Sequence, residues 1–513
     1  MQTLHQATPE ITELSVSAWF YRNRTIAGFD NPARSLYVSI RELVENSLDA
    51  CESVSVLPKI SVALERECTL EDYAALIGSG PEIFKLTIID NGSGIPADKV
   101  PQLIGKMLTG TKFTLKQSRG TFGLGGSLAL LYGQVTTQKP IEIVTGQIGS
   151  SERHRLLMRL DIENNTPIII EVERETKESS EHGTEVSYYL EGDWMRSKRK
   201  IVDYFSQTSV IVPYASIRFD DPDGNTLRLN RLTENLPMAP REMKPHPKGV
   251  DVEALKSMIL QTRAKNLRSF MTGSFQRIGA TTAKKLLLHA RLDSGRHPKE
   301  LTEEELVTIM KALNSYDKFQ PPSAESLSPA GVDLLETGIQ RLNPDIAVVR
   351  QRNPSVYEGH PFIIEVGAAY GGDLKSGVLL YRFANRIPLL YDERSGVSSR
   401  VIRELNLKNY GLKQDDPLAF FVHLCSTKVP YKTVGKEYIG DVDVVRREIE
   451  LGLKDCLRQI GERVRKKQRV SRNHRRQSRL KEYYEFMSEV LAESTGLAVQ
   501  TKHLFPEEAN DLD

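Results

Sequence analysis

The first 235 residues of the chain place a helix ahead of a run of closely spaced strands. Apolar residues at near-helical spacing predict a helix at 41–50, RELVENSLDA. A strand that runs into a turn follows at 85–92. Further strands are predicted one after another at 141–148, 154–162, 166–174 and 183–191. This order predicts an α/β sandwich with helices on one face of a mixed sheet.

With 513 residues, the chain is too long for one hydrophobic core, so we expect several domains. Proline-rich stretches at 236–249 and 320–331 are typical of linkers, and they enclose a helical segment. Strands return after the second linker, and a long helix begins near residue 441. The predicted units are a leader at 1–18, an α/β domain at 19–237, a helical domain at 238–319, a second α/β domain ending in the long helix at 320–481, and a tail at 482–513.

Composition argues against several classes of protein. The 69 Lys and Arg residues nearly balance the 67 Asp and Glu residues, so the overall charge indicates no particular partner. The four cysteines form no C-x-x-C pair, which argues against a zinc site or a disulfide framework. No apolar run reaches membrane-spanning length, and the polar N-terminus lacks signal-peptide features. We therefore expect a cytoplasmic protein without membrane contact, associated with the nucleoid in a prokaryote.

The predicted helix at 41–50 carries an acid and an amide on one face. Glu42 and Asn46 are four residues apart, so their side chains project from the same side, one turn apart. A solvated polar face would explain this pair if it stood alone. We interpret the nearby Glu45 and Asp49 as structural or surface charges.

Two glycine-containing segments accompany this helix. In DNGSGIP, 90–96, a buried Asp90 could accept a hydrogen bond from an exocyclic amino group, and Gly92 and Gly94 would let the backbone lie against a flat ring. The segment 105–130 contains RGTFGLGGS before an apolar helix, and its backbone N–H groups suit a phosphate chain. Its spacing matches neither a Rossmann fingerprint nor a Walker A loop.

Together with HGTEV at 182–186, these motifs resemble, in their order, the Bergerat-fold ATPases, which include gyrase B, Hsp90, MutL and the sensor histidine kinases. The resemblance implies that ATP and Mg²⁺ bind, that Asn46 holds the metal, and that Glu42 activates the attacking water. Asp90 would bind the adenine amino group beside Gly92 and Gly94, supported by Thr184. The residues implied to close over the phosphates are Thr111, Lys112, Gly120, Thr121, Phe122, Gly123, Leu124, Gly125, Gly126 and Ser127.

Longer segments resemble one branch of this group, the B subunit of topoisomerase VI, a type IIB DNA topoisomerase. The segments 29–52 and 103–134 resemble its ATPase domain, and SFQRIGATTAKKLL at 274–287 resembles its helix–two-turn–helix module. The segments 379–396 and 429–437 look like its transducer domain. The resemblance implies an α+β multidomain fold, with a Bergerat-fold ATPase sandwich, a helix–two-turn–helix insert and an α/β transducer ending in a long helix.

The same resemblance implies that ATP-driven homodimerisation of the ATPase domains gates the passage of double-stranded DNA, which relaxes supercoils and decatenates DNA. The sequence shows no plausible DNA-cleaving centre, because we recognise in it neither an acidic metal cluster nor a nucleophilic tyrosine motif. A separate A subunit would therefore make the break, in an A2B2 heterotetramer. Two alternatives are a MutL- or Hsp90-like ATPase clamp and a non-hydrolysing, topoisomerase-like interaction subunit.

Two basic features lie in the transducer-like region. Transducers of this family send a lysine to the γ-phosphate, and Lys428, Lys432 and Lys436 are candidates here. The GKE ending favours Lys436, which we predict to be catalytic. The segment 463–481 holds ten Lys and Arg residues and no acid, so we expect it to contact DNA phosphates or an acidic partner surface.

Overall fold

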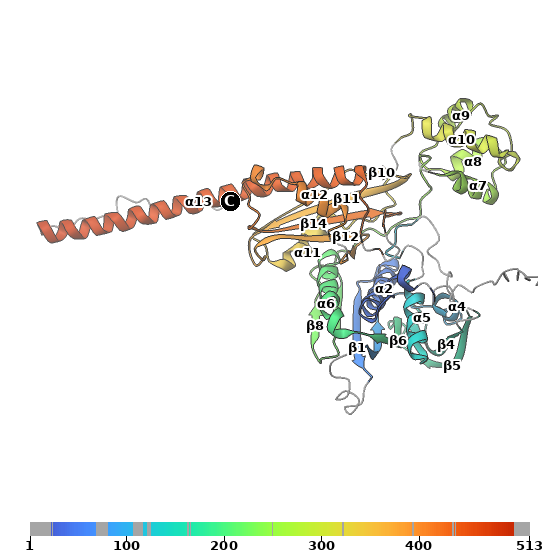
Figure 1. Cartoon of the computed structure of the whole chain (residues 1–513), viewed down its shortest axis with the longest axis horizontal. Helices are drawn as coiled ribbons and strands as arrows, with labels where there is room; N and C mark the ends of the chain where they lie inside the picture. Colours follow the sequence, from blue (N-terminus) through green and yellow to red (C-terminus); the bar gives the residue numbers. More distant parts are fainter. Residues whose placement is uncertain are drawn as a thin grey trace, which may run out of the picture.

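The computed structural model describes residues 22, 24–67, 81–105, 116–120, 125–161, 164, 166–248, 250–320, 323–391, 394–432, 436 and 438–496. They form an N-terminal α/β domain, a helical domain and a C-terminal α/β domain, from which one long helix projects (Figure 1). Within these residues, no helix combines the length and apolar character needed to span a membrane.

An eight-stranded sheet supports the N-terminal domain, with the strand order β5-β4-β3-β6-β2-β1-β7-β8. Helix α2 contacts α5, α6 and β6, so the helices form a layer on the sheet, and the predicted α/β sandwich is confirmed. The strands are β1 (Lys59–Arg66), β2 (Glu82–Ile89), β3 (Ile141–Gly146), β4 (Glu152–Asp161), β5 (Thr166–Thr176), β6 (Gly183–Gly192), β7 (Ser216–Asp220) and β8 (Thr226–Leu229). The helices are η1 (Arg24–Ala27), α2 (Pro32–Ser53), α4 (Val100–Gly105), α5 (Gly125–Thr137) and α6 (Trp194–Ile211).

Helix α2 is fixed at its start and along its apolar face. The side chain of Asn31 accepts a hydrogen bond from the backbone N–H of Arg34 at 2.9 Å, and Pro32 occupies the first helical position, where its fixed φ suits a helix. Val44 and Leu48 are buried in the core. The helix therefore holds its polar side chains at fixed positions.

The helical domain has a hydrophobic cluster of its own, which includes Leu255, Phe270, Leu286 and Leu313. Its last helix begins with a capping box, in which the Thr302 side chain and a glutamate three residues on each bind the other's backbone N–H. The elements are α7 (Val252–Gln261), α8 (Leu267–Ser274), α9 (Ala280–His289), η2 (Pro298–Glu300) and α10 (Glu303–Ser315).

The C-terminal α/β domain contains a six-stranded sheet, in which β10-β11-β14-β12-β13 are neighbours and β9 also pairs with β11. Its strands are β9 (Ile346–Gln351), β10 (Ser355–Tyr357), β11 (His360–Tyr370), β12 (Gly377–Ala384), β13 (Ile387–Pro388) and β14 (Pro417–Ser426). Its helices are α11 (Val332–Ile339), η3 (Gln340–Leu342), α12 (Val397–Glu404), η4 (Leu407–Tyr410) and α13 (Asp443–Thr495).

The two α/β domains pack directly on each other through α11 and α6. Gly338 of α11 lies so close to α6 that a Cβ there would be 1.8 Å from the carbonyl oxygen of Val210. Leu335 and Ile339 of α11 belong to the same hydrophobic cluster as the core of the N-terminal domain. The C-terminal domain is therefore placed against the helical layer that carries Glu42.

Helix α13 is packed in its first half and exposed in its second. Leu453, Leu457 and Ile460 are completely buried against the sheet, whereas every residue from 465 to 486 is exposed. The helix continues to Thr495, beyond residue 481, where we expected a polar tail to begin. The described residues therefore leave a long surface of this helix uncovered (Figure 1).

Candidate active site

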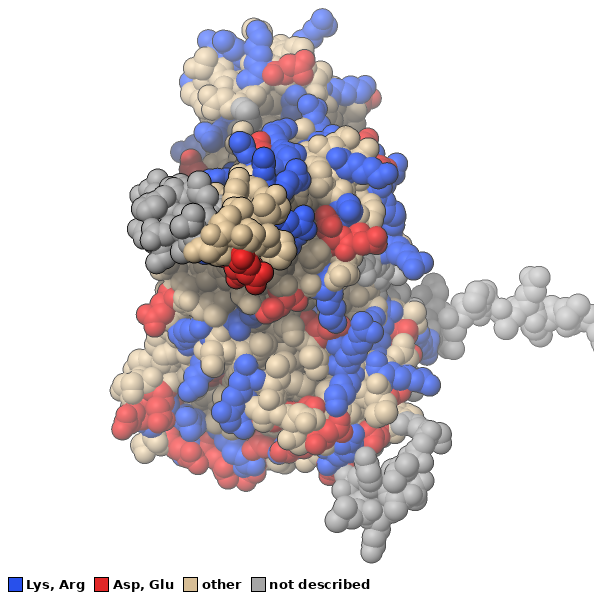
Figure 2. Space-filling model, turned by 90° about the vertical axis from the view of Figure 1, so that its left-hand side faces the viewer, with Lys and Arg blue, Asp and Glu red and all other residues tan. Residues whose placement is uncertain are grey.

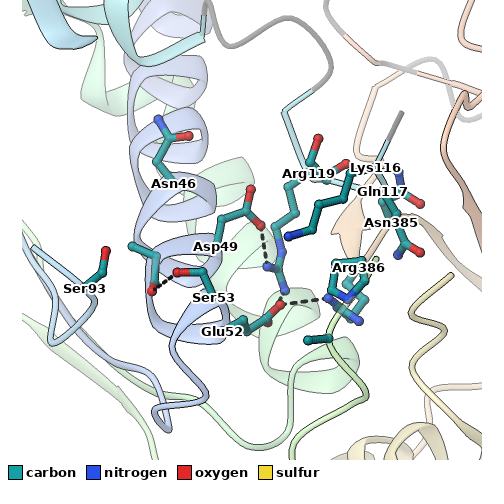
Figure 3. Close-up of a pocket in the computed structure, with 14 residues that line it drawn as sticks. Asn46, Asp49, Glu52, Ser53, Ser93, Lys116, Gln117, Arg119, Asn385 and Arg386 are labelled. Carbon is teal, nitrogen blue, oxygen red and sulfur yellow. Dashed lines mark hydrogen bonds and ion pairs between the residues drawn. The ribbon is translucent and has the colours of Figure 1, made fainter. Parts of the chain in front are cut away.

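Glu42 and Asn46 lie one turn apart on α2, as their spacing predicts. Glu42 is 8% exposed, and Arg41 donates a hydrogen bond to its Oε1 atom at 2.6 Å. Asn46 is exposed and lines a cavity of about 350 Å³ (Figure 3). The helix thus presents a buried, paired acid next to an amide at the cavity wall.

The start of α5 lies directly over this acid and amide. A Cβ at Gly125 would lie 1.7 Å from Oε2 of Glu42, and a Cβ at Gly126 would lie 2.8 Å from Nδ2 of Asn46. A side chain at the first position would clash, so glycine allows the N-terminal backbone of α5 to approach α2 closely. Ser127, next along, is buried. Gly120 follows Arg119, which lines the cavity. Outside the described residues lie Thr111, Lys112, Thr121, Phe122, Gly123 and Leu124.

Asp90 follows β2 and is held by three donors. Its Oδ1 atom accepts hydrogen bonds from the backbone N–H groups of Gly92 at 2.9 Å and Thr184 at 3.2 Å, and Ser47 of α2 donates to Oδ2 at 2.8 Å. Burial raises the pKa of Asp90, although these donors act in the opposite direction. The carboxyl group is therefore fixed in the turn and keeps lone pairs for a further donor.

The glycines of this turn are pressed against neighbouring backbone. A Cβ at Gly92 would lie 2.7 Å from Cβ of Ala50 on α2. Gly94 has a φ of +69°, and a Cβ there would lie 2.2 Å from the carbonyl oxygen of Gly146 on β3. Both positions need glycine because α2 and β3 occupy the space of a side chain, and the contact of this turn with a flat ring stays a prediction.

Lys436 extends from the C-terminal domain into the N-terminal domain. It is 7% exposed and adopts a left-handed backbone with a φ of +54°. Its Nζ atom lies 3.4 Å from Oε1 of Glu42 and 3.5 Å from Oε2 of Glu45, and it donates to the carbonyl oxygen of Arg119 at 3.1 Å. The structure thus brings the predicted lysine and the predicted acid together.

The other two lysine candidates lie elsewhere. Lys428 is exposed and pairs with Glu358 at 3.3 Å, and Lys432 is also exposed.

The two carboxylates that share Lys436 differ in their affinity for a proton. Burial alone would raise the pKa of Glu42, but Lys436 and Arg41 outweigh burial and lower this pKa to about 2. For Glu45, burial prevails over Lys436 and raises the pKa to about 7. From the sequence we interpreted Glu45 as a structural or a surface charge. Because it is only 2% exposed, it is not a surface charge. At neutral pH, Glu42 is therefore ionised, whereas Glu45 is near the midpoint of its titration.

The cavity next to Asn46 has a charged wall that the sequence motifs do not predict. Arg119 donates to Asp49 at 2.9 Å and to Glu52 at 2.6 Å, and Arg386 donates to Glu52 at 2.8 Å (Figure 3). Arg119 directly precedes Gly120, so its place before the glycine-rich segment was a usable signal. Both guanidinium groups are thus paired with acids at the C-terminal end of α2.

The exposed half of α13 carries two kinds of side chain. The ten basic residues of 463–481 are all exposed. Figure 2 shows the molecule from the side of the free end of α13, and Lys and Arg are numerous on this face. Farther along, exposed apolar residues recur at helical spacing. They are Leu480, Tyr483, Tyr484, Phe486, Val490 and Leu491. This stripe was not predicted from the sequence, because we expected a polar tail from residue 482.

Two family models match the chain. The model described as "Topoisomerase VI B subunit, transducer" matches residues 322–476, and that of the "Histidine kinase-, DNA gyrase B-, and HSP90-like ATPase" matches residues 31–191. The B subunit of type 2 DNA topoisomerase 6 from Sulfurisphaera tokodaii is 40% identical over 96% of this chain and 91% of its own length. The chain belongs to the family of topoisomerase VI B subunits. The corresponding B subunit from Metallosphaera sedula is 42% identical over 88% of this chain and 85% of its own length.

Membership of this topoisomerase VI family confirms the family and the ATPase class expected from the sequence. The matched ATPase region contains Glu42, Asn46, Asp90 and Thr184, and the matched transducer region contains Lys436. The N-terminal domain is accordingly called the ATPase domain below, and the C-terminal one the transducer. The roles of the individual residues remain predictions.

Proposed function

We propose that this topoisomerase VI B subunit binds ATP with Mg²⁺ on the polar side of α2 and hydrolyses it. Dimerisation of two ATPase domains on ATP binding would gate a DNA duplex. A separate A subunit, in an A2B2 heterotetramer, would cut a second duplex for passage, so that the cytoplasmic enzyme relaxes and decatenates DNA. The observation that carries this proposal is the contact of Lys436 with Glu42, because it joins the transducer to the acid of the ATPase domain.

The residues that contact the polar side of α2 suit a nucleotide. Asp90 would accept a hydrogen bond from the adenine amino group, and the start of α5 would receive the phosphates. Mg²⁺ prefers oxygen ligands and usually keeps waters and substrate phosphates, so the amide of Asn46 at the cavity wall fits as a single protein ligand. When bound, Mg²⁺ neutralises charge on the phosphates during transfer.

Glu42 would orient and deprotonate the attacking water. A carboxylate with a pKa of about 2 is a weak base, and here Lys436 and Arg41 keep the pKa that low. If Lys436 moves to the phosphates of bound ATP, one of these two cations leaves, and the pKa of Glu42 rises. The transducer lysine would therefore restrain the base until the nucleotide is in place.

The exposed half of α13 offers surfaces for two partners. The basic residues of 463–481 would contact the DNA backbone, since phosphate contacts need positive charge but no base-reading groups. The apolar stripe from Leu480 to Leu491 would bind the A subunit, because an exposed apolar stripe on a helix is typical of a protein interface. Successive parts of one helix, which meet at Leu480, would thus serve DNA and protein.

The test is relaxation of supercoiled plasmid by the B subunit with and without a co-expressed A subunit. We expect relaxation only with both subunits, ATP and Mg²⁺. Hydrolysis without strand passage by the assembled complex would favour an ATPase clamp, and no hydrolysis at all would favour a non-hydrolysing interaction subunit.

A further inference from the structure

The hairpin between β12 and β13 ends in a two-residue turn directed at the ATPase domain. Asn385 and Arg386 both adopt positive φ, 47° and 64°. A hairpin turn with two left-handed residues suits asparagine followed by glycine, whereas arginine meets a steric cost at the second position. The contacts of the Arg386 side chain offset that cost.

Arg386 is 4% exposed and links three parts of the chain. Its Nη2 atom donates to Oε2 of Glu52, in the last turn of α2, at 2.8 Å. Its Nη1 atom donates to the carbonyl and hydroxyl oxygens of Ser328 at 2.9 and 2.7 Å. From the transducer side, His423 accepts a hydrogen bond from the backbone N–H of Arg386 at 3.0 Å. The arginine is therefore held by the transducer and reaches the helix that carries Glu42.

The neighbouring Asn385 ties the same turn to the segment before the glycine-rich loop. Its Nδ2 atom donates to the carbonyl oxygen of Ser118 at 3.1 Å and to that of Ser426 at 2.9 Å. Its Oδ1 atom accepts from the backbone N–H of Ser426 at 2.9 Å. The turn is thus bound to β14 on one side and to residue 118 on the other.

Glu52 is shared by two arginines and a tyrosine. Besides Arg386, it accepts hydrogen bonds from Arg119 at 2.6 Å and from the hydroxyl of Tyr214 at 2.5 Å. Arg119 also pairs with Asp49 at 2.9 Å, so two acids of the last turn of α2 face two arginines. Loss of Arg386 would leave this buried group with one negative charge in excess.

Two transducer cations therefore meet at Arg119. Arg386 acts on its guanidinium through Glu52, and Lys436 donates to its carbonyl oxygen at 3.1 Å. We propose that Arg386 is a positioning residue: through Glu52, it holds Arg119 in the position in which the carbonyl oxygen of Arg119 accepts a hydrogen bond from Lys436. This proposal rests on the proposed ATP hydrolysis. The hairpin turn is then a second connection, besides Lys436, between transducer movement and the site.

The test measures kcat and KM for ATP in the A2B2 holoenzyme with Arg386→Met, Arg386→Lys and Glu52→Gln. We expect Arg386→Met to lower kcat about tenfold, which corresponds to an increase of about 1.4 kcal/mol in the activation free energy. The KM for ATP should change less than about twofold, because Asp90 and its hydrogen-bond donors are untouched. Arg386→Lys keeps the charge and should recover part of the lost kcat. Arg400→Met, which removes an exposed transducer arginine, is the control and should change neither parameter.

A double variant decides whether Arg386 acts through Glu52. We expect Arg386→Met with Glu52→Gln to be no slower than the slower single variant, whereas two independent losses would multiply and overturn the proposal. Unchanged kcat in Arg386→Met would overturn it as well. If the Arg386→Met holoenzyme does not assemble, kcat is measured for Arg386→Lys and Glu52→Gln instead. Unchanged kcat in both of these variants would also overturn the proposal. A wild-type holoenzyme that hydrolyses no ATP would refute the proposed function itself.

Discussion

Replacement of Glu45 by glutamine tests whether burial of this acid costs stability at neutral pH. The carboxyl of Glu45 has a pKa of about 7 in the folded chain, against an ordinary value of 4.5 in the unfolded chain. The folded chain therefore holds the proton more tightly, so the contribution of this group to stability is fully present below pH 4.5 and is lost as the pH rises to about 7. At 1.36 kcal/mol per pH unit, the loss amounts to about 3 kcal/mol.

Glutamine cannot ionise, so the Glu45→Gln chain should escape this loss. The difference between its melting temperature and that of the wild type should increase between pH 4.5 and pH 8. A unit of 150–250 residues changes its melting temperature by about 2–4 °C per kcal/mol, so about 3 kcal/mol corresponds to an increase of about 6–12 °C. Differential scanning calorimetry at several pH values measures it, with exposed Glu304→Gln as the control. A difference that stays constant, or shrinks with pH, would refute the reasoning. Glu42 does not interfere, since its lowered pKa affects stability only as the pH falls from 4.5 toward 2.

Three further predictions concern the ATP site. Glu42→Ala should keep ATP binding, measured by nucleotide titration, but lose turnover, because this acid is the proposed base; undiminished turnover would contradict the assignment. Asp90→Asn should raise the Kd for ATP about tenfold or more, since it weakens a hydrogen bond to a charged group worth about 1.5–3 kcal/mol; an unchanged Kd would exclude the adenine contact. Lys436→Ala should slow hydrolysis about tenfold or more with dimerisation largely kept, whereas Lys428→Ala should not; the reverse result would identify the wrong lysine.

The fold was predictable where periodicity and turns are local. The strands β3 to β6 follow one another with short turns, so each gives its own signal, and the predicted strands at 141–148, 154–162, 166–174 and 183–191 overlap them. The short strand β7 carries no individual prediction, and its position depends on parallel pairing with β1, more than 150 residues earlier. Strand formation of this kind is decided by tertiary context, which a local pattern does not contain.

The residues of the candidate site were likewise predictable from sequence only where their signal is local. Glu42 and Asn46 were paired from sequence because both lie on one helix, and Asp90 was found because a strand and two glycines surround it. Glu45 is next to Asn46 in sequence, yet it is buried and faces Lys436, 391 residues away. Nothing within the helix distinguishes a glutamate that ends in solvent from one that meets a lysine of another domain. Lys436 and Glu42 also link the domains and were predicted, whereas Glu45 and Arg386 are linking residues that only the folded chain reveals. The experiments on Glu45 and Arg386 test that link separately from the ATP chemistry itself.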